Sequence, residues 1–277
     1  MIIRKLSDKR YNVVIVQGSP RKENSCADQM SKTEKIVNHI IDKYSTFIDF
    51  ELVDLAVDGV KVQPCRGCIS TSNGFHCHFK CSCYKKGSEK NPDLMYEQDV
   101  YDKLLNCDAF LIVTPIHWYS VSTQVKAMFD RLVCVNQTIT TEQAIELFGK
   151  GNIKDSSITG NTELTNKSRH LLKNHLAGKV GSFYCHGDNG ASDYKGEEKP
   201  YTGEEMWDMK NAIMPLVFQC RYSEIEVPDQ LIECFYINEG KEYYQANIDF
   251  EKTPEFIERA DNLVERLLEF LEQKQET

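Results

Sequence analysis

The chain has 277 residues and a formal net charge of −9 at pH 7, and 41 % of its residues are hydrophobic, which is enough for a real core. The negative charge, without a local cluster of Lys or Arg, argues against a nucleic-acid partner, and no segment has the length and hydrophobicity of a membrane span. The first ten residues lack the apolar core of a signal peptide, so we expect a cytoplasmic protein.

The first predicted strand covers residues 12–17, a β-branched run that ends at Gly18 and is typical of a central strand buried on both faces. Apolar residues at three- and four-residue steps then predict a helix over residues 26–44. The next strand is expected over residues 47–55, where apolar residues alternate imperfectly.

A long connection over residues 56–96 follows, with little helical or strand pattern and with five of the eleven cysteines. Loops of this length inside a compact domain are unusual and tend to be functional. A helix is predicted over residues 97–106, and the apolar run 109–113 is the third strand, which we expect Pro115 to end. Apolar spacing over residues 121–132 predicts the helix behind the next loop.

Residues 136–178 look like a polar insertion, available as a lid or a subunit contact. It has one predicted helix, whose start at Thr140 with Gln143 three positions on has the arrangement of a capping box. The fourth strand, residues 179–185, leads into a polar, glycine-bearing loop that contains Gly187.

A helix over residues 206–219, a fifth strand within 224–236 and a final helix opened by Pro254 after the N-cap Thr253 complete the chain. Strands that alternate with helices predict an α/β fold with a doubly wound, five-stranded parallel sheet and helices on both faces. We expect a single domain over residues 1–277 that carries the cysteine-rich loop and the polar insertion.

Two segments, residues 18–25 and 114–120, directly follow strands and precede helices, where open α/β sheets bind ligands. The first offers hydroxyls, a carboxamide and two cations at a helix start, which favours an anion and indicates a seat for one phosphate. A polar turn with an N-cap serine is the simpler alternative. The second offers a rigid proline and aromatic rings, which suit a flat heterocycle. Together the segments predict a mononucleotide with a large ring.

Other phosphate-binding motifs fit less well. The first segment lacks the spacing of G-x-G-x-x-G and of a P-loop, and a phosphatase loop would need a thiolate where Gln17 and Gly18 stand. The chain resembles instead the NAD(P)H-dependent FMN reductases of flavodoxin-like fold. Residues 18–25 look like their G-S-P-R-x-x-N-[ST] phosphate signature, residues 108–131 look like their flavin-contacting block, and the resemblance covers roughly residues 12–135.

The resemblance implies FMN as the cofactor and assigns residues to it. Those that would hold the phosphate are Ser19, Arg21, Asn24 and Ser25, and those that would border the ring are Pro115, Ile116, His117, Trp118 and Tyr119. The loop with Gly187 would approach the other side of the ring. The family often has tyrosine at the position of His117 and glycine at that of Tyr119, and the side chain of Tyr119 would narrow the space beside the ring. From its residue type, His117 is either a proton donor, the one candidate catalytic residue, or a hydrogen-bonded loop residue.

The resemblance further implies an oxidoreductase that passes electrons from NAD(P)H through FMN to a quinone, a nitro or azo compound, or free flavin. The alternatives are an iron-sulfur flavoprotein, an electron carrier that docks redox proteins without a small-molecule substrate, and a flavin-binding regulatory module. A homodimer or homotetramer is expected, because the family tends to form its sites between subunits.

Cys65 and Cys68 form a C-x-x-C pair, followed by Cys77, Cys81 and Cys83. Four such thiolates could carry zinc or an iron-sulfur cluster. The iron-sulfur flavoproteins of the same broad family place a compact cysteine motif in this connection, but eight residues separate Cys68 from Cys77 here, more than in those relatives. The sequence leaves open iron-sulfur, zinc and a loop without metal, and we assign no metal ligand. The cysteines expected to be small buried side chains are Cys107, Cys134, Cys185, Cys220 and Cys234.

Overall fold

The computed structural model describes residues 10–21, 30–69, 75, 77–149, 162–187, 209–236 and 254–276. Its main sheet has the strand order β2-β1-β4-β7-β8, with every neighbouring pair parallel, and the short β5 pairs antiparallel with the end of β4. This is the predicted five-stranded, doubly wound sheet of a flavodoxin-like fold. The strands are β1 (Tyr11–Gln17), β2 (Ile48–Asp54), β4 (Ala109–His117), β5 (Ser120–Val121), β7 (Val180–Gly187) and β8 (Ile232–Tyr236).

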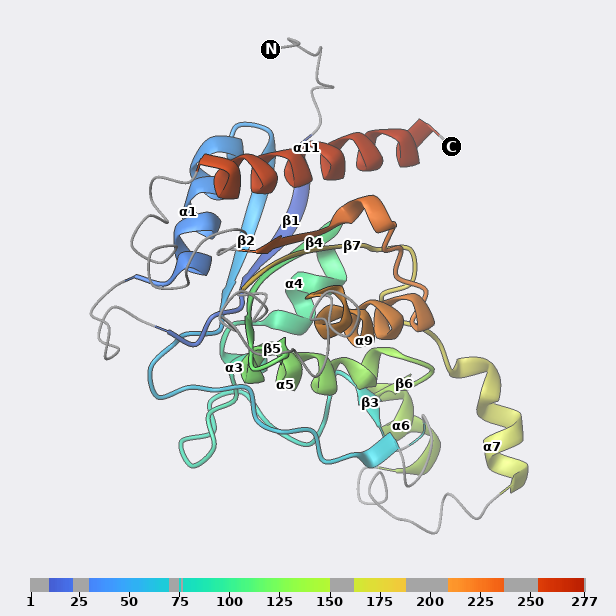
Figure 1. Cartoon of the computed structure of the whole chain (residues 1–277). Helices are drawn as coiled ribbons and strands as arrows, with labels where there is room; N and C mark the ends of the chain where they lie inside the picture. Colours follow the sequence, from blue (N-terminus) through green and yellow to red (C-terminus); the bar gives the residue numbers. More distant parts are fainter. Residues whose placement is uncertain are drawn as a thin grey trace, which may run out of the picture.

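Helices cover both faces of the sheet (Figure 1). α1 and α11 pack on one face, against side chains such as Ile15 and Leu111. α4, α5 and α9 pack on the other face, against Val16 and Ile112. Because both faces are covered, β1 and β4 are continuous apolar runs instead of alternating ones. The helices of the first face are α1 (Lys32–Tyr44) and α11 (Pro254–Glu276), and those of the second are α4 (Val100–Asn106), α5 (Thr123–Arg131) and α9 (Met209–Tyr222).

Strand β4 runs on to His117, so the expectation that Pro115 ends it is wrong. The proline pairs in register with His186 of β7. The carbonyl of Val113 faces β1 and accepts a hydrogen bond from the N–H of Gly18 at 2.8 Å. The backbone of Pro115, two residues on, faces the same side but lies beyond the last residue of β1. The missing N–H of the proline therefore removes no hydrogen bond from the sheet.

Helix α1 begins at Lys32, later than the predicted start at residue 26. Ser31 caps it, because its hydroxyl oxygen accepts a hydrogen bond from the backbone N–H of Glu34 at 3.0 Å. Residues 22–29, where the first predicted turns lie, are outside the described part of the chain.

The helix predicted over residues 97–106 is two short helices, α3 (Leu94–Glu97) and α4. They are separated at Asp99, whose φ of 51° is left-handed and cannot continue a right-handed helix. The apolar spacing on which the prediction rested runs through this break and does not reveal it.

The cysteine-rich loop and the polar insertion pair with one another. β3 (His78–Phe79) and β6 (Ile139–Thr140) form a two-stranded parallel sheet, which lies beside α6 (Thr141–Phe148) and apart from the main sheet (Figure 1). Phe75, Ala144 and Phe148 pack together with Ile139 as a small hydrophobic cluster. The insertion therefore holds the far end of the cysteine-rich loop in place.

Helix α6 has the predicted capping box, with hydrogen bonds in both directions between Thr140 and Gln143. The prediction of one helix in the insertion is wrong, because α7 (Thr162–Ser168) and a 3-10 turn (Arg169–Leu171) follow. The sequence of α7 is almost entirely polar, so it has no apolar period that could have revealed a helix.

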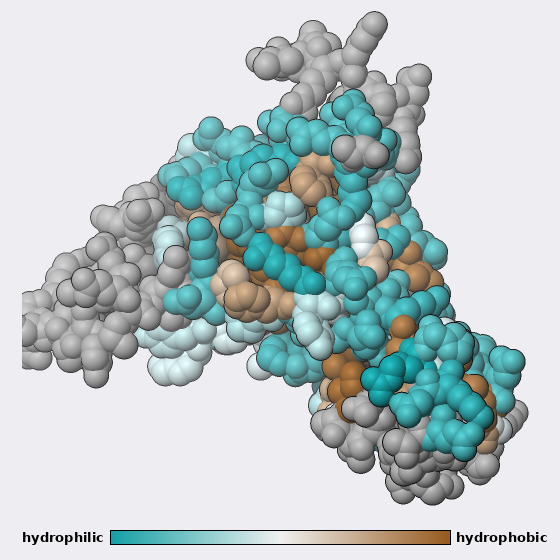
Figure 2. Space-filling model, turned by 90° about the vertical axis from the view of Figure 1, so that its right-hand side faces the viewer, coloured by the Kyte–Doolittle hydropathy of each residue, from teal (hydrophilic) through white to brown (hydrophobic). Residues whose placement is uncertain are grey.

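The surface seen from the right-hand side of Figure 1 is mostly hydrophilic, with hydrophobic side chains in separate areas (Figure 2). No helix in the described part of the chain is long and apolar enough to cross a membrane. Trp118 is by far the most exposed of the large hydrophobic side chains described, at 93 %. Its neighbour Tyr119 is exposed as well, so two aromatic rings face solvent at one place in the chain.

Candidate functional site

The carboxyl ends of β1, β4 and β7 lie side by side at one edge of the sheet. The connection after β1 leads to β2 on one side of β1, and the connection after β2 crosses to β4 on the other side. The direction of winding therefore reverses at β1, and this edge contains the topological switch point, the usual ligand position of such sheets. Ser19 and Arg21 follow β1, Pro115 to Tyr119 end or follow β4, and Gly187 ends β7. The structure therefore brings the described site residues to one edge. The predicted site residues outside the described part are Asn24 and Ser25.

Gly18 lets the first loop pass closely over β4. A Cβ atom here would lie 2.7 Å from the carbonyl oxygen of Val113 and 2.7 Å from Cγ2 of Val125, closer than such atoms can approach. The carbonyl of Gly18 accepts a hydrogen bond from the hydroxyl of Ser122 at 2.5 Å. The glycine therefore fixes the loop against β4 and the start of α5.

Side chains set the direction of the loop after Gly18. Ser19 is buried, its N–H donates to Oε1 of Gln17 at 2.5 Å, and its hydroxyl oxygen accepts from the N–H of Arg21 at 3.2 Å. Such side-chain bonds to nearby backbone are typical of a polar turn. The N-cap serine of that alternative is not in residues 18–21, because Ser31 caps α1. Whether the turn also favours an anion depends on the charges around it.

Three cationic side chains, Arg21, Lys32 and Lys35, converge on the start of α1, and we call them the α1 cations. The pKa of Lys32 is lowered, first by burial and then by the positive charges of Arg21 and Lys35. The helix dipole adds positive potential at the same end. An anion bound here would relieve the repulsion between the α1 cations, so the charges fit a phosphate group.

His186 lies beside this end of α1. Its ring is buried, and Nε2 makes a hydrogen bond with the hydroxyl of Thr33 at 2.8 Å. Burial, Lys32 and His117 lower the pKa of His186 to about 3, so the ring is neutral at pH 7. Nδ1 is buried and has no hydrogen-bond partner among the residues that the structure describes. Because unpaired buried polar atoms are rare, this nitrogen fits a site that a polar ligand completes.

The second loop is a tight hairpin turn between β4 and β5. Trp118 and Tyr119 are its two central residues, with φ values of 49° and 65°, and His117 pairs with Ser120 on either side. Both left-handed positions would normally be filled by Asn or Gly. A left-handed conformation costs about 1–2 kcal/mol for each of these bulky residues. Strain of this kind is concentrated at functional sites, and here it presents two exposed aromatic rings.

A pocket of about 470 Å³, the His117 pocket, lies beside this hairpin. Its lining includes Pro64, Cys65, His117, Trp118, Thr123 and Lys126. His117 is exposed, yet nearby protein atoms desolvate its ring and lower its pKa below the ordinary value. The ring is therefore mainly neutral at pH 7, which suits a hydrogen-bonding role better than a stored proton.

Pro115, Ile116 and Gly187 lie behind the hairpin. Pro115 is buried and Ile116 is half-buried against the core. A Cβ atom at Gly187 would lie 3.1 Å from Cβ of Ile116, so the glycine allows the ends of β4 and β7 to meet closely. These residues form a rigid support for the exposed loop residues.

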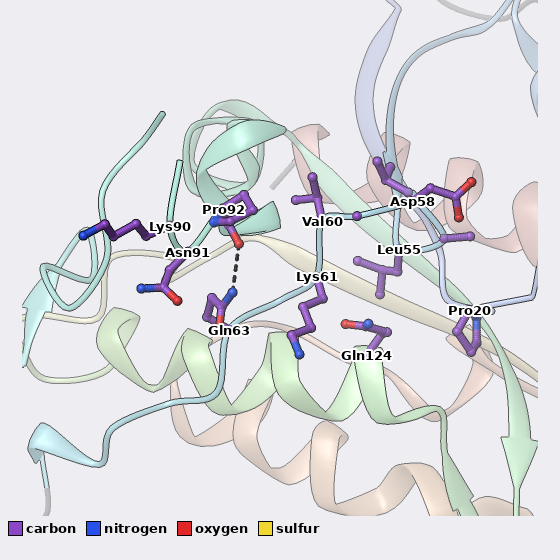
Figure 3. Close-up of a pocket in the computed structure, with 13 residues that line it drawn as sticks. Pro20, Leu55, Asp58, Val60, Lys61, Gln63, Lys90, Asn91, Pro92 and Gln124 are labelled. Carbon is purple, nitrogen blue, oxygen red and sulfur yellow. Dashed lines mark hydrogen bonds between the residues drawn. The ribbon is translucent and has the colours of Figure 1, made fainter. Parts of the chain in front are cut away.

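A second pocket, of about 600 Å³, has Pro20 in its lining and is lined mainly by residues of the long connection, both apolar and polar (Figure 3). Lys61, Gln63 and Gln124 face it, and Nε2 of Gln63 donates to the carbonyl of Pro92 at 2.9 Å. The sequence analysis missed these residues, because scattered polar side chains in a long loop cannot be told from solvated ones.

The five cysteines of the long connection, Cys65, Cys68, Cys77, Cys81 and Cys83, lie close together, and we call them the cysteine cluster. Sγ of Cys68 and Sγ of Cys83 are 3.2 Å apart. The pKa of Cys81 is lowered to about 6, first by a hydrogen bond from Cys83 and also by the charge of Arg131, although burial acts in the opposite direction. In the described residues, no three His, Cys, Asp or Glu side chains are placed to hold a metal ion, so zinc and iron-sulfur gain no support.

Arg131 was also missed by the sequence analysis. It is fully buried at the end of α5, and its guanidinium pairs with Asp93 at 2.8 Å and donates to the carbonyl of Gln63 at 3.1 Å. The same group stacks on the ring of Tyr84, 4.5 Å from its centroid. A buried arginine is usually recognisable only from its partners, and these lie more than thirty residues away in the chain.

A family model and several solved structures are similar to this chain. A family model described as NADPH-dependent FMN reductase matches residues 11–188. The crystal structure of RosB with the bound intermediate 8-demethyl-8-formylriboflavin-5'-phosphate is similar at 11 % identity and a TM-score of 0.50, over 96 % of this chain and 81 % of that one. It supports the fold alone.

Two further solved structures have lower TM-scores. General stress protein 14 from Treponema denticola in complex with FMN has a TM-score of 0.43 and 11 % identity, over 95 % of this chain and 99 % of that one. The FMN-dependent NADH-azoreductase from Bacillus anthracis has a TM-score of 0.45 and 12 % identity, over 91 % and 99 %. No curated protein sequence matches the chain.

Proposed function

The chain belongs to the family of NADPH-dependent FMN reductases, and from this we propose that it binds FMN across the carboxyl ends of β1, β4 and β7. When bound, FMN supplies the chemistry by accepting a hydride from NAD(P)H and passing electrons on. The protein holds the phosphate, borders the ring and limits what can reach it. The proposed acceptor is a quinone, a nitro or azo compound, or free flavin.

The observation that carries the proposal is the convergence of the α1 cations beside a buried His186, whose Nδ1 has no partner in the described part of the chain. We assign the FMN phosphate to this place, next to Ser19 and Arg21. The phosphate would neutralise the α1 cations and accept hydrogen bonds near the helix start. Asn24 and Ser25 keep their proposed phosphate contacts from the sequence resemblance.

We assign the ring of FMN to the hairpin and the His117 pocket. Trp118 and Tyr119 offer flat aromatic surfaces, while Pro115 and Ile116 support the turn from behind. The lowered pKa of His117 supports a role as a neutral hydrogen-bonding group beside the ring or the acceptor. Gly187 is assigned to the other side of the ring. A homodimer or homotetramer is also proposed, supported by the exposure of Trp118.

Titration with FMN and with riboflavin, followed by quenching of flavin fluorescence, tests the phosphate assignment. Riboflavin lacks the phosphate, so its Kd should be at least about tenfold higher, a difference of about 1.4 kcal/mol. Lys35→Gln should weaken FMN binding while leaving riboflavin binding unchanged. Lys43→Gln, in the last turn of the same helix, is the matched control and should change neither. Equal affinities for the two flavins would refute the assignment.

Turnover separates the reductase from an electron carrier. FMN-loaded protein should oxidise NADPH rapidly when a quinone or an azo dye is added, with absorbance at 340 nm as the readout. Electron exchange with redox proteins alone, without any turnover of small acceptors, would identify a carrier. Size-exclusion chromatography with light scattering tests the oligomer, and a monomer at all concentrations would contradict that part.

A further inference from the structure

The long connection folds so that two of its thiols almost touch. Cys68 precedes strand β3 and Cys83 follows it, yet their sulfur atoms are only 3.2 Å apart. A disulfide bond needs about 2.05 Å, so a small side-chain rotation would suffice. Both residues are half-buried, whereas Cys77 and Cys81 are buried. The pair therefore belongs, with the equally half-buried Cys65, to the more accessible part of the cysteine cluster.

The cysteine cluster borders the proposed electron-transfer site. Cys65 lines the His117 pocket together with His117 and Trp118. Cys65 in turn lies within electrostatic range of Cys68 and Cys81. A molecule in the His117 pocket would thus lie beside the thiols as well as beside the hairpin.

A rigid frame holds the cluster around a positive charge. Arg131 is buried beneath it, fixed by the ion pair with Asp93. The hydroxyl of Tyr96 donates to the carbonyl of Cys81 and holds that part of the loop. A buried guanidinium favours the thiolate form of neighbouring cysteines, which is the form that reacts with disulfides. The charge of Arg131 helps to lower the pKa of Cys81, whereas the hydrogen bonds with Cys81 and Cys68, together with burial, raise the pKa of Cys83.

We propose that Cys68 and Cys83 are a redox-active dithiol that reduces low-molecular-weight disulfides beside the His117 pocket. Cys68, as its thiolate, attacks a substrate disulfide and releases the first substrate thiol. Cys83 then resolves the mixed disulfide and releases the second. Two protein thiols and one substrate disulfide thus become one protein disulfide and two substrate thiols.

Return to the dithiol rests on the proposed function. NADPH and one proton supply the two electrons and two protons through FMN, so the protein disulfide becomes two thiols and NADPH becomes NADP⁺. The complete cycle is a disulfide reductase activity in addition to the reduction of quinones or azo compounds.

The chain contains a matched control pair. Cys185 and Cys234 are opposite each other on β7 and β8, with their sulfur atoms 3.0 Å apart. This pair is at least as close as the first, but it is held in the main sheet, and Cys185 is fully buried. If closeness alone decided the chemistry, both pairs would be oxidised equally.

The oxidative half can be measured without flavin. Reduced full-length protein is treated with hydroxyethyl disulfide, the remaining thiols are alkylated, and peptides are mapped under non-reducing conditions. A link between Cys68 and Cys83 should form at least about tenfold faster than one between Cys185 and Cys234. Cys83→Ser should instead trap the mixed disulfide on Cys68, and Cys234→Ser should behave as the wild type. Equal rates for both pairs, or no link at Cys68, would overturn the proposal.

The reductive half is measured by anaerobic addition of NADPH to the oxidised, FMN-loaded protein, followed by thiol counting. Two thiols should return for each NADPH consumed. If FMN binds and a quinone is reduced but no thiols return, the dithiol proposal fails while the proposed function stands. If FMN does not bind, the proposed function fails and the oxidative half is judged alone. Stoichiometric zinc or iron on these sulfurs would overturn the proposal, since ligated sulfurs cannot pair.

Discussion

His186 predicts a specific sensitivity of the fold to acid. The pKa of its buried ring is about 3 in the folded protein, against an ordinary value near 6.5. The folded state therefore stays unprotonated while the unfolded state takes up a proton below about pH 6.5, so stability is lost as the pH falls from there towards 3. At pH 5 the difference is about 1.5 pH units at about 1.4 kcal/mol each, or about 2 kcal/mol.

The variant His186→Gln isolates this effect. The amide of glutamine can still meet the hydroxyl of Thr33 but cannot take up a proton. Urea titrations of the flavin-free protein at pH 7 and pH 5 give the loss of unfolding free energy for each form. The wild type should lose about 2 kcal/mol more than the variant. The neighbouring charges, Lys32 and His117, are present in both and cancel in the comparison.

A control variant at an exposed histidine, His170→Gln, should keep the full loss of the wild type. Should the wild type and His186→Gln lose the same free energy between the two pH values, the reasoning would be refuted. In that case His186 would be protonated in the folded state, and its Nδ1 could not be the neutral, unpaired group that fits a ligand.

Three further outcomes are expected. Asp93→Asn should lower the free energy of unfolding by about 3–5 kcal/mol in urea titrations, because it leaves Arg131 buried without its counter-charge. The control Asp229→Asn removes an exposed ion pair and should lower it by less than about 1 kcal/mol. Gly18→Ala should weaken FMN binding at least about tenfold in fluorescence titrations, and unchanged affinity would contradict the close approach to β4. Tyr119→Gly should raise the unfolding free energy by about 1 kcal/mol while slowing quinone reduction, and a destabilised variant would contradict the strain assigned to the turn.

The order and type of the main elements could be predicted because their signals are local. The β-branched runs before Gly18 and Thr114 are visible in the sequence, and so is the capping box at Thr140. Pro115 misled the strand prediction, since whether a proline is tolerated depends on where the neighbouring strand ends. That is a property of two strands together and cannot be seen in one segment.

The site could be predicted only in part for the same reason. The two loops are local patterns, and their described residues do meet at one edge of the sheet. The contact between Thr33 and His186 joins residues 153 positions apart, and the pair of β3 with β6 joins two segments that each looked irregular. No periodicity records such contacts, so the buried histidine and the closeness of Cys68 to Cys83 appear only in three dimensions.

Helix α5 connects the three parts of the proposed site. At its start, the hydroxyl of Ser122 accepts from the N–H of Val125 and donates to the carbonyl of Gly18, so the helix cap also fixes the phosphate loop. In its middle, the side of the helix that carries Lys126 lines the His117 pocket. At its end, Arg131 is buried beneath the cysteine cluster. One helix therefore bears residues at the phosphate loop, at the His117 pocket and at the cysteine cluster.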